Sequence, residues 1–567
     1  MRRREFGRQA LRLAAGLGLT SISISRTGGL MLLGGCADDP SMPLDGRDGR
    51  IDGDALPAIA QASSKTSVLV IGSGYGSAVT ALRLTEAGIP VTMLEAGRLW
   101  QPGADGLKFC KPFQPDGRAM WFEDKTETQM DTFLGAATEM PVPREAGVLE
   151  ARGPKTMRVF QGKGVGGGSL VNMALYLAPE KAKVRQILPT IDADAFVDKY
   201  IARAAQKLKP GQASQRAWQS EFYRYGRVGQ ANAEKAGFKT FRLQSGYDFE
   251  YMDRELDNKV PLSALGGEAG FGNNYGKRSL DQTYLAEALG TGLLTIHALH
   301  IVKNIKTDPS GGYVVDVEQI DVKGAVLGKK QLTCTHLFVG AGSMASSELL
   351  VRARERGDLP NLNKAVGTKW GPNGDLFIAL DNPLTSPTGL GQQATIPPLA
   401  FATNDAKGRR VVSQIAPLPM GLPLWTSLVI MIADNPEAGH FTYDASRDAV
   451  NLNWAREQNQ PSVDAAKFIF DQINAKAKTS YSTTIAFKDK GQFGDQVTYH
   501  PVGGIPLGEA TDDYGRIKEH PGLYVVDSAL IPLGIGANPS LSITALAERN
   551  IETVLATDFA SVAKRAP

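Results

Sequence analysis

The first residues whose spacing points to chemistry form a glycine-rich turn, Gly72-Ser-Gly74-Tyr-Gly76-Ser77. The turn follows residues 67–71, an apolar and β-branched run that is typical of a buried parallel strand. Glycines here let the backbone approach a pyrophosphate closely, and the N–H groups of a following helix attract the negative charge. The segment predicts a strand, a phosphate-binding loop and a helix.

An acidic residue completes this unit. Residues 78–88 carry the apolar pattern of a helix, and residues 91–95 read as a second strand that ends in Glu95. Glu95 lies about 20 residues beyond Gly76, where a carboxylate accepts hydrogen bonds from the hydroxyls of an adenosine ribose. An acid at this point favours an unphosphorylated ribose. The fingerprint therefore indicates NAD or FAD rather than NADP, and does not choose between the two.

Two more segments could approach a ligand. Residues 161–172, QGKGVGGGSLVN, form a second glycine-rich loop between apolar neighbours, which indicates close backbone approach to a bulky flat or charged group. Near the C-terminus, residues 523–527 predict a strand that ends in Asp527, and a helix is predicted over residues 541–554. That helix would point its N-terminus at a group bound near Asn538.

Five longer segments resemble the glucose–methanol–choline (GMC) flavin oxidoreductases, and among them the bacterial cholesterol oxidases with non-covalent FAD. The resemblance covers nearly all of residues 65–560. Its most specific pieces are GSGYGSAVTALRL…LEAG, QGKGVGGGSLVN, LFVGAGSMASSELLVRARERGDLPNLN, YHPVGGIPLGEATDDYGRI and GLYVVDSALIPLGIGANPSLSITALAERN.

The resemblance implies an α/β fold (α+β overall), with a Rossmann-like FAD-binding domain and a substrate domain on a mainly antiparallel sheet with helices. Both domains are expected to be discontinuous. The FAD-binding domain would comprise residues 65–100, 156–190, 280–370 and 496–560, and the substrate domain residues 101–155, 191–279 and 371–495.

The same resemblance implies a set of cofactor-binding residues. The adenosine and pyrophosphate side would be held by Tyr75, Gly76 and Glu95, and the flavin would be lined by the second glycine loop and by Asp527. No His or Cys lies in that loop, so no covalent flavin link is expected there. The full set is Gly72, Gly74, Tyr75, Gly76, Glu95, Gly167, Gly168, Asn172, Val302 and Asp527.

Alcohol oxidation needs a base for the hydroxyl proton and a hydride acceptor, which flavin N5 supplies. His500, in Tyr-His-Pro-Val-Gly-Gly, matches the family's active-site His, as base or positioner of the substrate hydroxyl. Asn538 matches the second active-site polar residue, which contacts flavin and substrate. The other histidines are expected to be structural: His297, His300, His336, His440 and His520.

Gln414 departs from the family pattern, which has a Glu here on a loop over the cavity. In cholesterol oxidases this Glu moves a proton from C4 to C6 of the steroid. An amide cannot do so near neutral pH, so oxidation is expected to persist while Δ5→Δ4 isomerisation is impaired. Further departures near the flavin are Met173, Leu175, Ser528 and Ser540, and the expected apolar wall residues are Leu418, Pro419, Met420, Leu422, Leu424 and Trp425.

The composition of the chain excludes some classes of binding partner and metal site. The 62 basic and 59 acidic residues nearly balance, which argues against nucleic acid binding. Three cysteines exclude a disulfide framework or zinc ribbon, and pairing of Cys110 with Cys334 stays open. No metal is expected, because His297-x-x-His300 is an unsupported pair. The expected partners are a hydrophobic alcohol, molecular oxygen and a membrane surface.

The N-terminal residues resemble an export signal. Arg3, Arg4 and Phe6 match the twin-arginine export pattern, and Leu33-Gly-Gly-Cys36 resembles a lipoprotein cleavage box. Residues 1–36 are therefore expected to be a signal, with Cys36 either lipidated or incidental, and residues 37–64 a solvated linker. No later stretch is apolar enough for a membrane span. A periplasmic, envelope-anchored or secreted location is expected.

The resemblance implies an FAD-dependent oxidase of 3β-hydroxysterols or similar bulky secondary alcohols. A dehydrogenase of the same fold, passing electrons to a quinone or cytochrome, is one alternative. A flavin-containing lipoprotein that only binds sterol is the other. His500 and Asn538 argue against that last hypothesis, and Gln414 favours it.

Overall fold

The computed structural model describes residues 65–128, 130–133, 136–389, 391–418, 425–487 and 491–560, with two short strands, β1 (Ile22–Ile24) and β2 (Leu30–Leu32). Those strands aside, the predicted signal with Cys36 and the predicted linker lie outside the described residues. The same holds for Pro419, Met420, Leu422 and Leu424.

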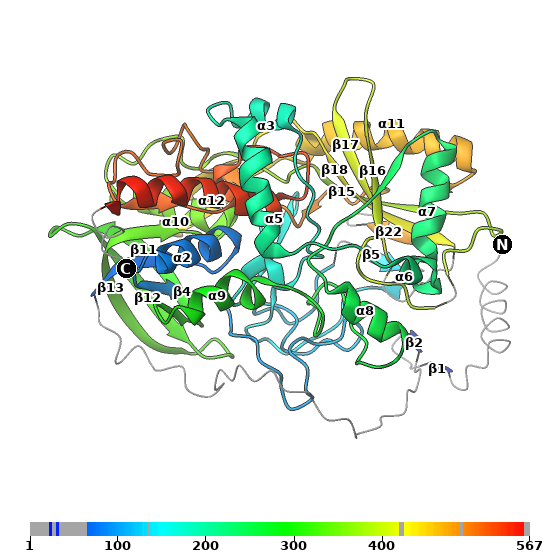
Figure 1. The fold of residues 1–567 in the computed structure, drawn as a ribbon, viewed down its shortest axis with the longest axis horizontal. Helices are drawn as coiled ribbons and strands as arrows, with labels where there is room; N and C mark the ends of the chain where they lie inside the picture. The colour runs from blue at the N-terminus through cyan, green and yellow to red at the C-terminus, as the bar shows by residue number, and fades with distance from the viewer. Residues whose placement is uncertain are drawn as a thin grey trace.

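The first half of the molecule is built on a seven-stranded sheet in the order β10-β4-β3-β13-β12-β11, with β25 paired to β13 (Figure 1). Its central strands run parallel and are buried on both faces, as the apolar run before the first glycine turn predicts. The strands are β3 (Lys65–Ile71), β4 (Val91–Leu94), β10 (Leu294–His297), β11 (His300–Thr307), β12 (Tyr313–Ile320), β13 (Val326–Val339) and β25 (Leu523–Val525).

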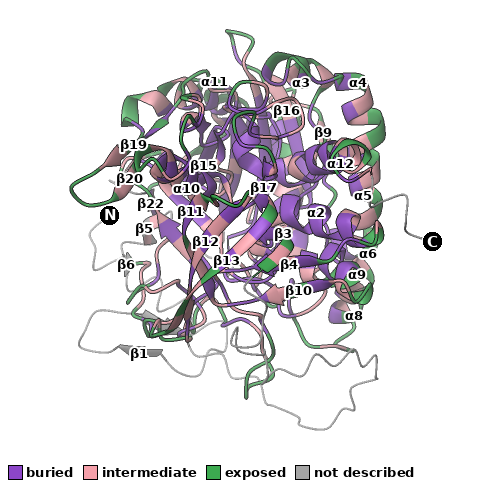
Figure 2. Cartoon of the chain, turned by 90° about the vertical axis from the view of Figure 1, so that its left-hand side faces the viewer, coloured by how far each residue is buried: buried purple, intermediate pink, exposed green. Residues whose placement is uncertain are grey.

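Helices cover this sheet. α12 packs on α2, and α2 on α9. Figure 2 shows the strands and α2 largely buried between more exposed outer helices. The helices are α2 (Tyr75–Glu86), α3 (Lys181–Ile187), α4 (Ala193–Ala195), α5 (Ala202–Leu208), α9 (Tyr284–Gly290), α10 (Ser343–Glu355) and α12 (Pro539–Thr557).

The second half is an antiparallel six-stranded sheet in the order β21-β15-β18-β17-β16-β9, which helices α7 and α11 cover (Figure 1). The Rossmann-like and antiparallel parts of the predicted fold class are thus confirmed. The elements are β9 (Thr240–Arg242), β15 (Asp375–Asp381), β16 (Leu399–Asn404), β17 (Arg410–Ala416), β18 (Thr426–Ala433), β21 (Ser480–Tyr481), α6 (Gln215–Gln219), α7 (Arg224–Lys235), α8 (Phe249–Leu256) and α11 (Gln460–Ala477).

Small sheets join the two halves. In one of them, β14 (Thr368–Gly371) pairs with β24 (Val502–Gly504), which brings the start of the second sheet beside the C-terminal segment. The remaining strands are β5 (Met130–Phe133), β6 (Ala136–Ala137), β7 (Leu149–Arg152), β8 (Arg158–Gly162), β19 (His440–Asp444), β20 (Ala449–Asn453), β22 (Ile485–Phe487) and β23 (Val497–Thr498).

The predicted domain boundaries stay a prediction. Some helices and strands pack against elements that were assigned to the other domain. α5 contacts α12 of the first half, although residues 191–279 were assigned to the substrate domain. Similarly, β19 and β20 contact α10. In the described part of the chain, no helix combines the length and apolar character that a membrane crossing needs.

Candidate active site

A cavity of about 1730 Å³ is lined by residues of both sheets. Ile71 and Leu94 line it from the ends of β3 and β4, and Gln414 and Ile430 line it from β17 and β18. Every cofactor-binding residue predicted from the sequence lies on its wall. So do His500, Asn538 and Gln414.

The three glycines of the first turn are needed for different reasons. Gly72 has a φ of +85°, and a Cβ there would lie 2.2 Å from the carbonyl oxygen of Gly340. A Cβ on Gly76 would lie 1.6 Å from the carbonyl oxygen of Val526. At Gly74 a Cβ would meet no described atom within 4 Å, because this residue borders the cavity. Gly74 is also the N-cap of α2, so first-turn N–H groups lie beside open space.

Glu95 borders the cavity just beyond β4. Its Oε2 accepts from the backbone N–H and the hydroxyl of Ser73, at 3.1 and 2.6 Å, and its Oε1 accepts from the N–H of Gly97 at 2.8 Å. Ser73 Oγ also accepts from the N–H of Gly166, at 3.0 Å. Ser73 thus ties the acid to both glycine loops, a role that the first motif did not reveal.

The second glycine loop forms the short 3-10 helix η2 (Gly167–Leu170). It packs against the first turn, since a Cβ on Gly167 would lie 3.0 Å from Cα of Gly74. Beyond the loop, Asn172 Nδ2 donates to the Tyr75 hydroxyl at 2.9 Å. Burial raises the pKa of Tyr75, so this hydroxyl stays neutral.

A partly buried lysine holds the far end of this loop. Lys277 Nζ donates to the carbonyl oxygen of Leu170 at 3.0 Å, and also to that of Asn172. Burial lowers the pKa of this ammonium to about 7, and the charge of Asp281 opposes the shift. The sequence offered no signal for this contact.

Asp527 and Val302 lie at other parts of the wall. Asp527 Oδ2 accepts from the N–H of Gly342 at 2.8 Å and from Ser346 Oγ at 2.5 Å, and its Oδ1 accepts from the N–H of Ala529 at 2.8 Å. Burial raises its pKa. Both carboxylate oxygens therefore bind protein donors, and the side chain holds the start of α10 in place.

His500 lies between β23 and β24, and its partner is a residue that sequence reasoning missed. His500 Nδ1 lies 2.7 Å from Oδ1 of Asp375, whose side chain is 1% exposed. Asp375 Oδ2 accepts from Thr498 Oγ1 at 2.9 Å and from the N–H of Tyr499 at 3.0 Å. Because a carboxylate only accepts, His500 donates its Nδ1–H, so the lone pair of the neutral imidazole lies on Nε2.

Asn538 continues this polar chain from the N-cap of α12. Its Nδ2 lies 3.4 Å from Nε2 of His500, and its Oδ1 accepts from Nε2 of Gln414 at 2.6 Å. The expected loop at residue 414 is not observed, because Gln414 lies inside strand β17, between β16 and β18. The structure thus brings together three residues predicted from separate motifs, and adds Asp375.

The rest of the wall near this chain is mostly apolar. Leu418 is buried and lines the cavity, as do Phe377 and Leu428. Trp425 is described but is not one of the lining residues, so its predicted wall position is wrong. The four sequence departures Met173, Leu175, Ser528 and Ser540 all line the cavity.

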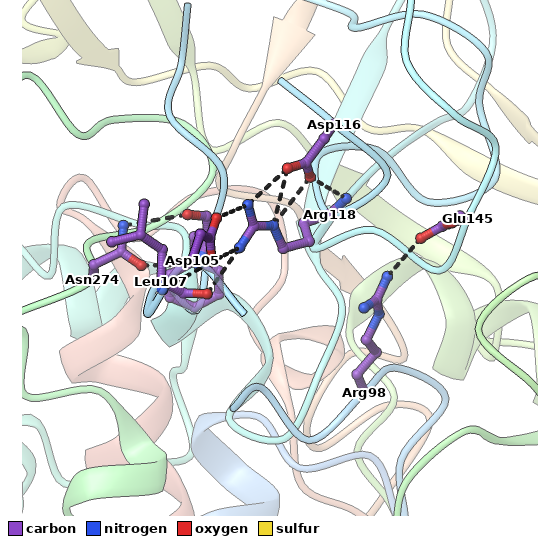
Figure 3. Close-up of polar contacts among 8 residues, drawn as sticks. Arg98, Asp105, Leu107, Asp116, Arg118, Glu145 and Asn274 are labelled. Atoms are coloured by element: carbon purple, nitrogen blue, oxygen red, sulfur yellow. Dashed lines mark hydrogen bonds and ion pairs between the residues drawn. The ribbon is translucent and has the colours of Figure 1, made fainter. Parts of the chain in front are cut away.

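One stretch of the cavity wall comes from a loop that an arginine fixes (Figure 3). Arg118 donates to Asp105, to Asp116 and to the carbonyl oxygen of Leu107, the last at 2.8 Å. Asn274 holds the same loop through the backbone N–H of Phe109, at 2.9 Å. Residues 112–113 of this loop line the cavity, so the network fixes part of the wall.

Several histidines were expected to lie outside the site, and most of them pack inside the protein, as do two cysteines. His336 lies in β13 against Phe559, with ring centroids 4.5 Å apart, and His297 is buried. His300 lines the cavity; its backbone N–H donates to the carbonyl oxygen of Glu95 at 2.9 Å, and its Nδ1 lies 2.6 Å from the carbonyl oxygen of Ala298. Cys110 and Cys334 are buried free thiols. Among the described residues, no group of three or more His, Cys, Asp or Glu side chains could hold a metal ion.

Comparison with known proteins identifies the class. The GMC oxidoreductase family model matches residues 67–354, and two C-terminal models of that family match residues 373–487 and 437–547. The chain belongs to the GMC oxidoreductases, which are FAD-binding flavoproteins, and it is an alcohol oxidoreductase.

The chain is also similar in sequence to cholesterol oxidases and in structure to two solved oxidases. A cholesterol oxidase of Mycobacterium tuberculosis is 27% identical over 558 residues, covering 85% of this chain and 90% of that protein. One from Acinetobacter baumannii is 24% identical over 542 residues, covering 85% and 93%. A solved fungal aryl-alcohol oxidase, 13% identical, covers 88% of this chain and all of its own with a TM-score of 0.56. A pyridoxine 4-oxidase from Mesorbium loti, 14% identical, covers 86% and 98% with a TM-score of 0.53. These two structures establish the fold.

The cavity fits the cofactor of this family. Cβ atoms at Gly74 and Gly168 would meet no described atom within 4 Å, so both backbones are open to a ligand. The N-terminus of α2 lies at this open space, where it favours a pyrophosphate. Glu95 lies at the end of the adjacent strand, where an acid binds a ribose.

Proposed function

We propose that this chain oxidises a 3β-hydroxysterol, or a similarly bulky secondary alcohol, to the ketone, with O2 as acceptor and H2O2 as second product. The observation that carries the proposal is the chain Asp375–His500–Asn538 at the wall of a large, mostly apolar cavity that also contains both glycine loops. The names of the relatives, cholesterol oxidases at 24 to 27% identity, support the choice of sterol.

The polar chain is arranged to bind a hydroxyl group. His500 Nε2 has a lone pair and Asn538 Nδ2 has an N–H, and the 3.4 Å contact between them is long for a hydrogen bond. A substrate hydroxyl can replace that contact by donating to Nε2 and accepting from Nδ2. His500 then takes the proton as the carbinol carbon loses hydride, and Asp375 stabilises the resulting imidazolium. When bound, FAD supplies the hydride acceptor.

Anaerobic mixing with cholesterol tests this proposal directly. We expect the visible absorbance of the oxidised flavin to disappear within the mixing experiment. We also expect His500→Asn to slow this reduction strongly, whereas His440→Asn, a change on the exposed start of β19, should not. An oxidised spectrum that persists over a panel of sterols and simpler alcohols would leave only the sterol-binding role.

The acceptor and the steroid product need separate assays. Oxygen consumption with peroxide release supports an oxidase, whereas turnover only with a quinone or cytochrome supports the dehydrogenase alternative. Because Gln414 cannot carry a proton, we propose that the Δ5 ketone accumulates. Rapid stoichiometric formation of the conjugated enone would contradict this.

Cofactor attachment and export complete the proposal. We propose that the FAD is non-covalent, so that acid precipitation releases it into the supernatant. We also propose twin-arginine export, for which Arg3 and Arg4 are the supporting residues. Replacing both with Lys should retain the protein in the cytoplasm, and the mass of the exported N-terminus reports whether Cys36 is lipidated.

A further inference from the structure

A short buried turn, residues 372–374, joins β14 to β15 behind the site. Its middle residue, Asn373, is 3% exposed and has a φ of +55°. Gly374 follows with a φ of +74°, and a Cβ there would lie 1.7 Å from the carbonyl oxygen of Ala433. Asp375, the first residue of β15, comes directly after this turn. The backbone of the turn therefore has little room to shift.

The side chain of Asn373 binds the backbone just before Asn538. Its Oδ1 accepts from the N–H of Ile535 at 2.9 Å, and its Nδ2 donates to the carbonyl oxygen of Ala537 at 2.8 Å. The carbonyl of Ala537 belongs to the peptide group that ends at Cα of Asn538, and a peptide group is planar. The amide of Asn373 thus fixes the plane from which the side chain of Asn538 projects.

We infer that Asn373 is a positioning residue for alcohol oxidation, because its amide holds Asn538 at the distance from His500 at which one substrate hydroxyl can bind both side chains. The inference rests on the proposed function. It adds a residue that acts through Asn538, since Asn373 itself does not line the cavity.

One turn holds both halves of the proposed site. Asp375, two residues after Asn373, has its Oδ1 2.7 Å from Nδ1 of His500. Asn373 holds the segment that leads into Asn538. The two atoms that would bind the hydroxyl, Nε2 of His500 and Nδ2 of Asn538, are 3.4 Å apart. Because each half is tied to the same buried turn, the spacing between these atoms depends on both contacts.

The backbone at position 373 does not itself require asparagine. A φ of +55° lies in the left-handed region, where glycine is unstrained and asparagine is tolerated. Glycine fills the next position, Gly374, which also has a positive φ. The facing loop leaves room for the amide, because a Cβ on Gly534 would lie 3.1 Å from Oδ1 of Asn373. The side chain of Asn373 is therefore explained by its contacts to Ile535 and Ala537.

Anaerobic flavin reduction in the Asn373→Gly holoenzyme tests this role, because glycine suits the backbone and only the amide is lost. We expect the FAD content of the parent and a limiting rate lower by a factor on the order of ten to a hundred, as for a misplacement of about 1 Å at a reacting group. The ascending limb of the pH profile should move to higher pH, since the N–H of Asn538 no longer opposes protonation of Nε2 of His500. Asp375 faces Nδ1 in both proteins and does not contribute to this change.

A second variant and a control accompany this measurement. Asn373→Asp keeps the size and the acceptor for Ile535 but places a carboxylate oxygen against the carbonyl of Ala537, so it should also be slowed. Asn363→Gly is the matched control, because Asn363 Oδ1 accepts from the N–H of Ala365 at 2.8 Å and its Nδ2 donates to the carbonyl oxygen of Glu509 at 3.1 Å. Asn363 does not line the cavity, so the rate and pH profile of the parent are expected.

Coupling to Asn538 distinguishes positioning from a general loss of stability. In an Asn538→Ala background, adding Asn373→Gly should change the rate by less than about twofold, whereas independent effects would multiply. Binding of the ketone product is a readout besides activity, because its carbonyl oxygen can accept from Nδ2 of Asn538. Titration of the oxidised holoenzyme with the 3-ketosteroid, followed by flavin absorbance, should show about threefold to tenfold weaker binding in Asn373→Gly.

Each outcome has a separate meaning. If the parent flavin is not reduced by any alcohol, the proposed function fails and this role fails with it. If the parent is reduced and Asn373→Gly keeps its rate and pH profile, only the role of Asn373 is refuted. Effects that multiply in the double variant, or an equal loss in Asn363→Gly, would also refute it. Loss of FAD from both Asn373 variants would assign the residue to folding and overturn the inference.

Discussion

Asp375→Asn is the most informative perturbation of the proposed catalytic chain Asp375–His500–Asn538, because it keeps the shape of the side chain and changes one acceptor into a donor. Asp375 Oδ2 accepts from the N–H of Tyr499 at 3.0 Å, and Oδ1 faces Nδ1 of His500 at 2.7 Å. The new amide has one oxygen for these two positions. If that oxygen stays with Tyr499, the NH2 group faces His500, and the imidazole must move its hydrogen to Nε2.

The size of the effect follows from the two orientations. Turning the amide oxygen to His500 would leave the buried N–H of Tyr499 facing a donor, which costs about 1–3 kcal/mol. The competent tautomer is then populated at about 1 to 20%. Loss of the hydrogen bond between the carboxylate and the developing imidazolium removes another ~1.5–3 kcal/mol. We therefore expect anaerobic flavin reduction to slow by about 10² to 10⁴.

Stopped-flow reduction over a range of alcohol concentrations measures this limiting rate. Asp381→Asn is the matched control, because Asp381 ends the same strand, and its carboxylate accepts from Thr426 Oγ1 at 2.7 Å and from the N–H of Thr483 at 3.3 Å. Flavin content and melting temperature should be close to the parent values in both variants. A limiting rate within threefold of the parent for Asp375→Asn would refute the tautomer argument.

Two further predictions concern the glycine loops. Gly76→Ala should lower the free energy of unfolding by about 1–3 kcal/mol or more, because its Cβ would lie 1.6 Å from a backbone carbonyl oxygen. For Gly74→Ala we expect the apoprotein to have the melting temperature of the parent apoprotein, and FAD to bind at least about tenfold more weakly. Apoprotein melting curves and flavin fluorescence titration check both, and equal FAD affinity for Gly74→Ala would contradict the phosphate-binding role. Burial lowers the pKa of Lys277 to about 7, so between pH 7 and pH 10.5 the unfolded chain binds a proton that the folded chain does not, and the free energy of unfolding should rise with pH. Urea titrations of Lys277→Met should show a flatter rise, while Lys259→Met, on the surface, should keep the parent slope.

Asp375, the partner of His500, shows what sequence patterns do not reveal. Asp375 stands at the start of an apolar strand, DLFIALD, and no motif distinguishes its acid from Asp381 at the other end. It reaches His500 because β14 pairs with β24, with Gly371 opposite Val502, and this pairing joins segments that are far apart in the chain. Ser73 and Lys277 were missed for the same reason, since their partners lie in another loop.

The sequence by itself determined the dinucleotide-binding unit, from β3 through α2 to β4, because its signals are local: a buried strand, glycines where the backbone must be bare, and an acid about 20 residues on. It also predicted His500 and Asn538 as site residues, through the motifs that surround each of them, and the structure places both on the cavity wall. Only the tertiary structure decided the donor and acceptor order from Asp375 to Gln414, and it placed Gln414 on a strand where a loop was expected. The physical reason is that a side chain's hydrogen-bonding role depends on the partner that folding brings to it, and these partners come from four separate parts of the chain.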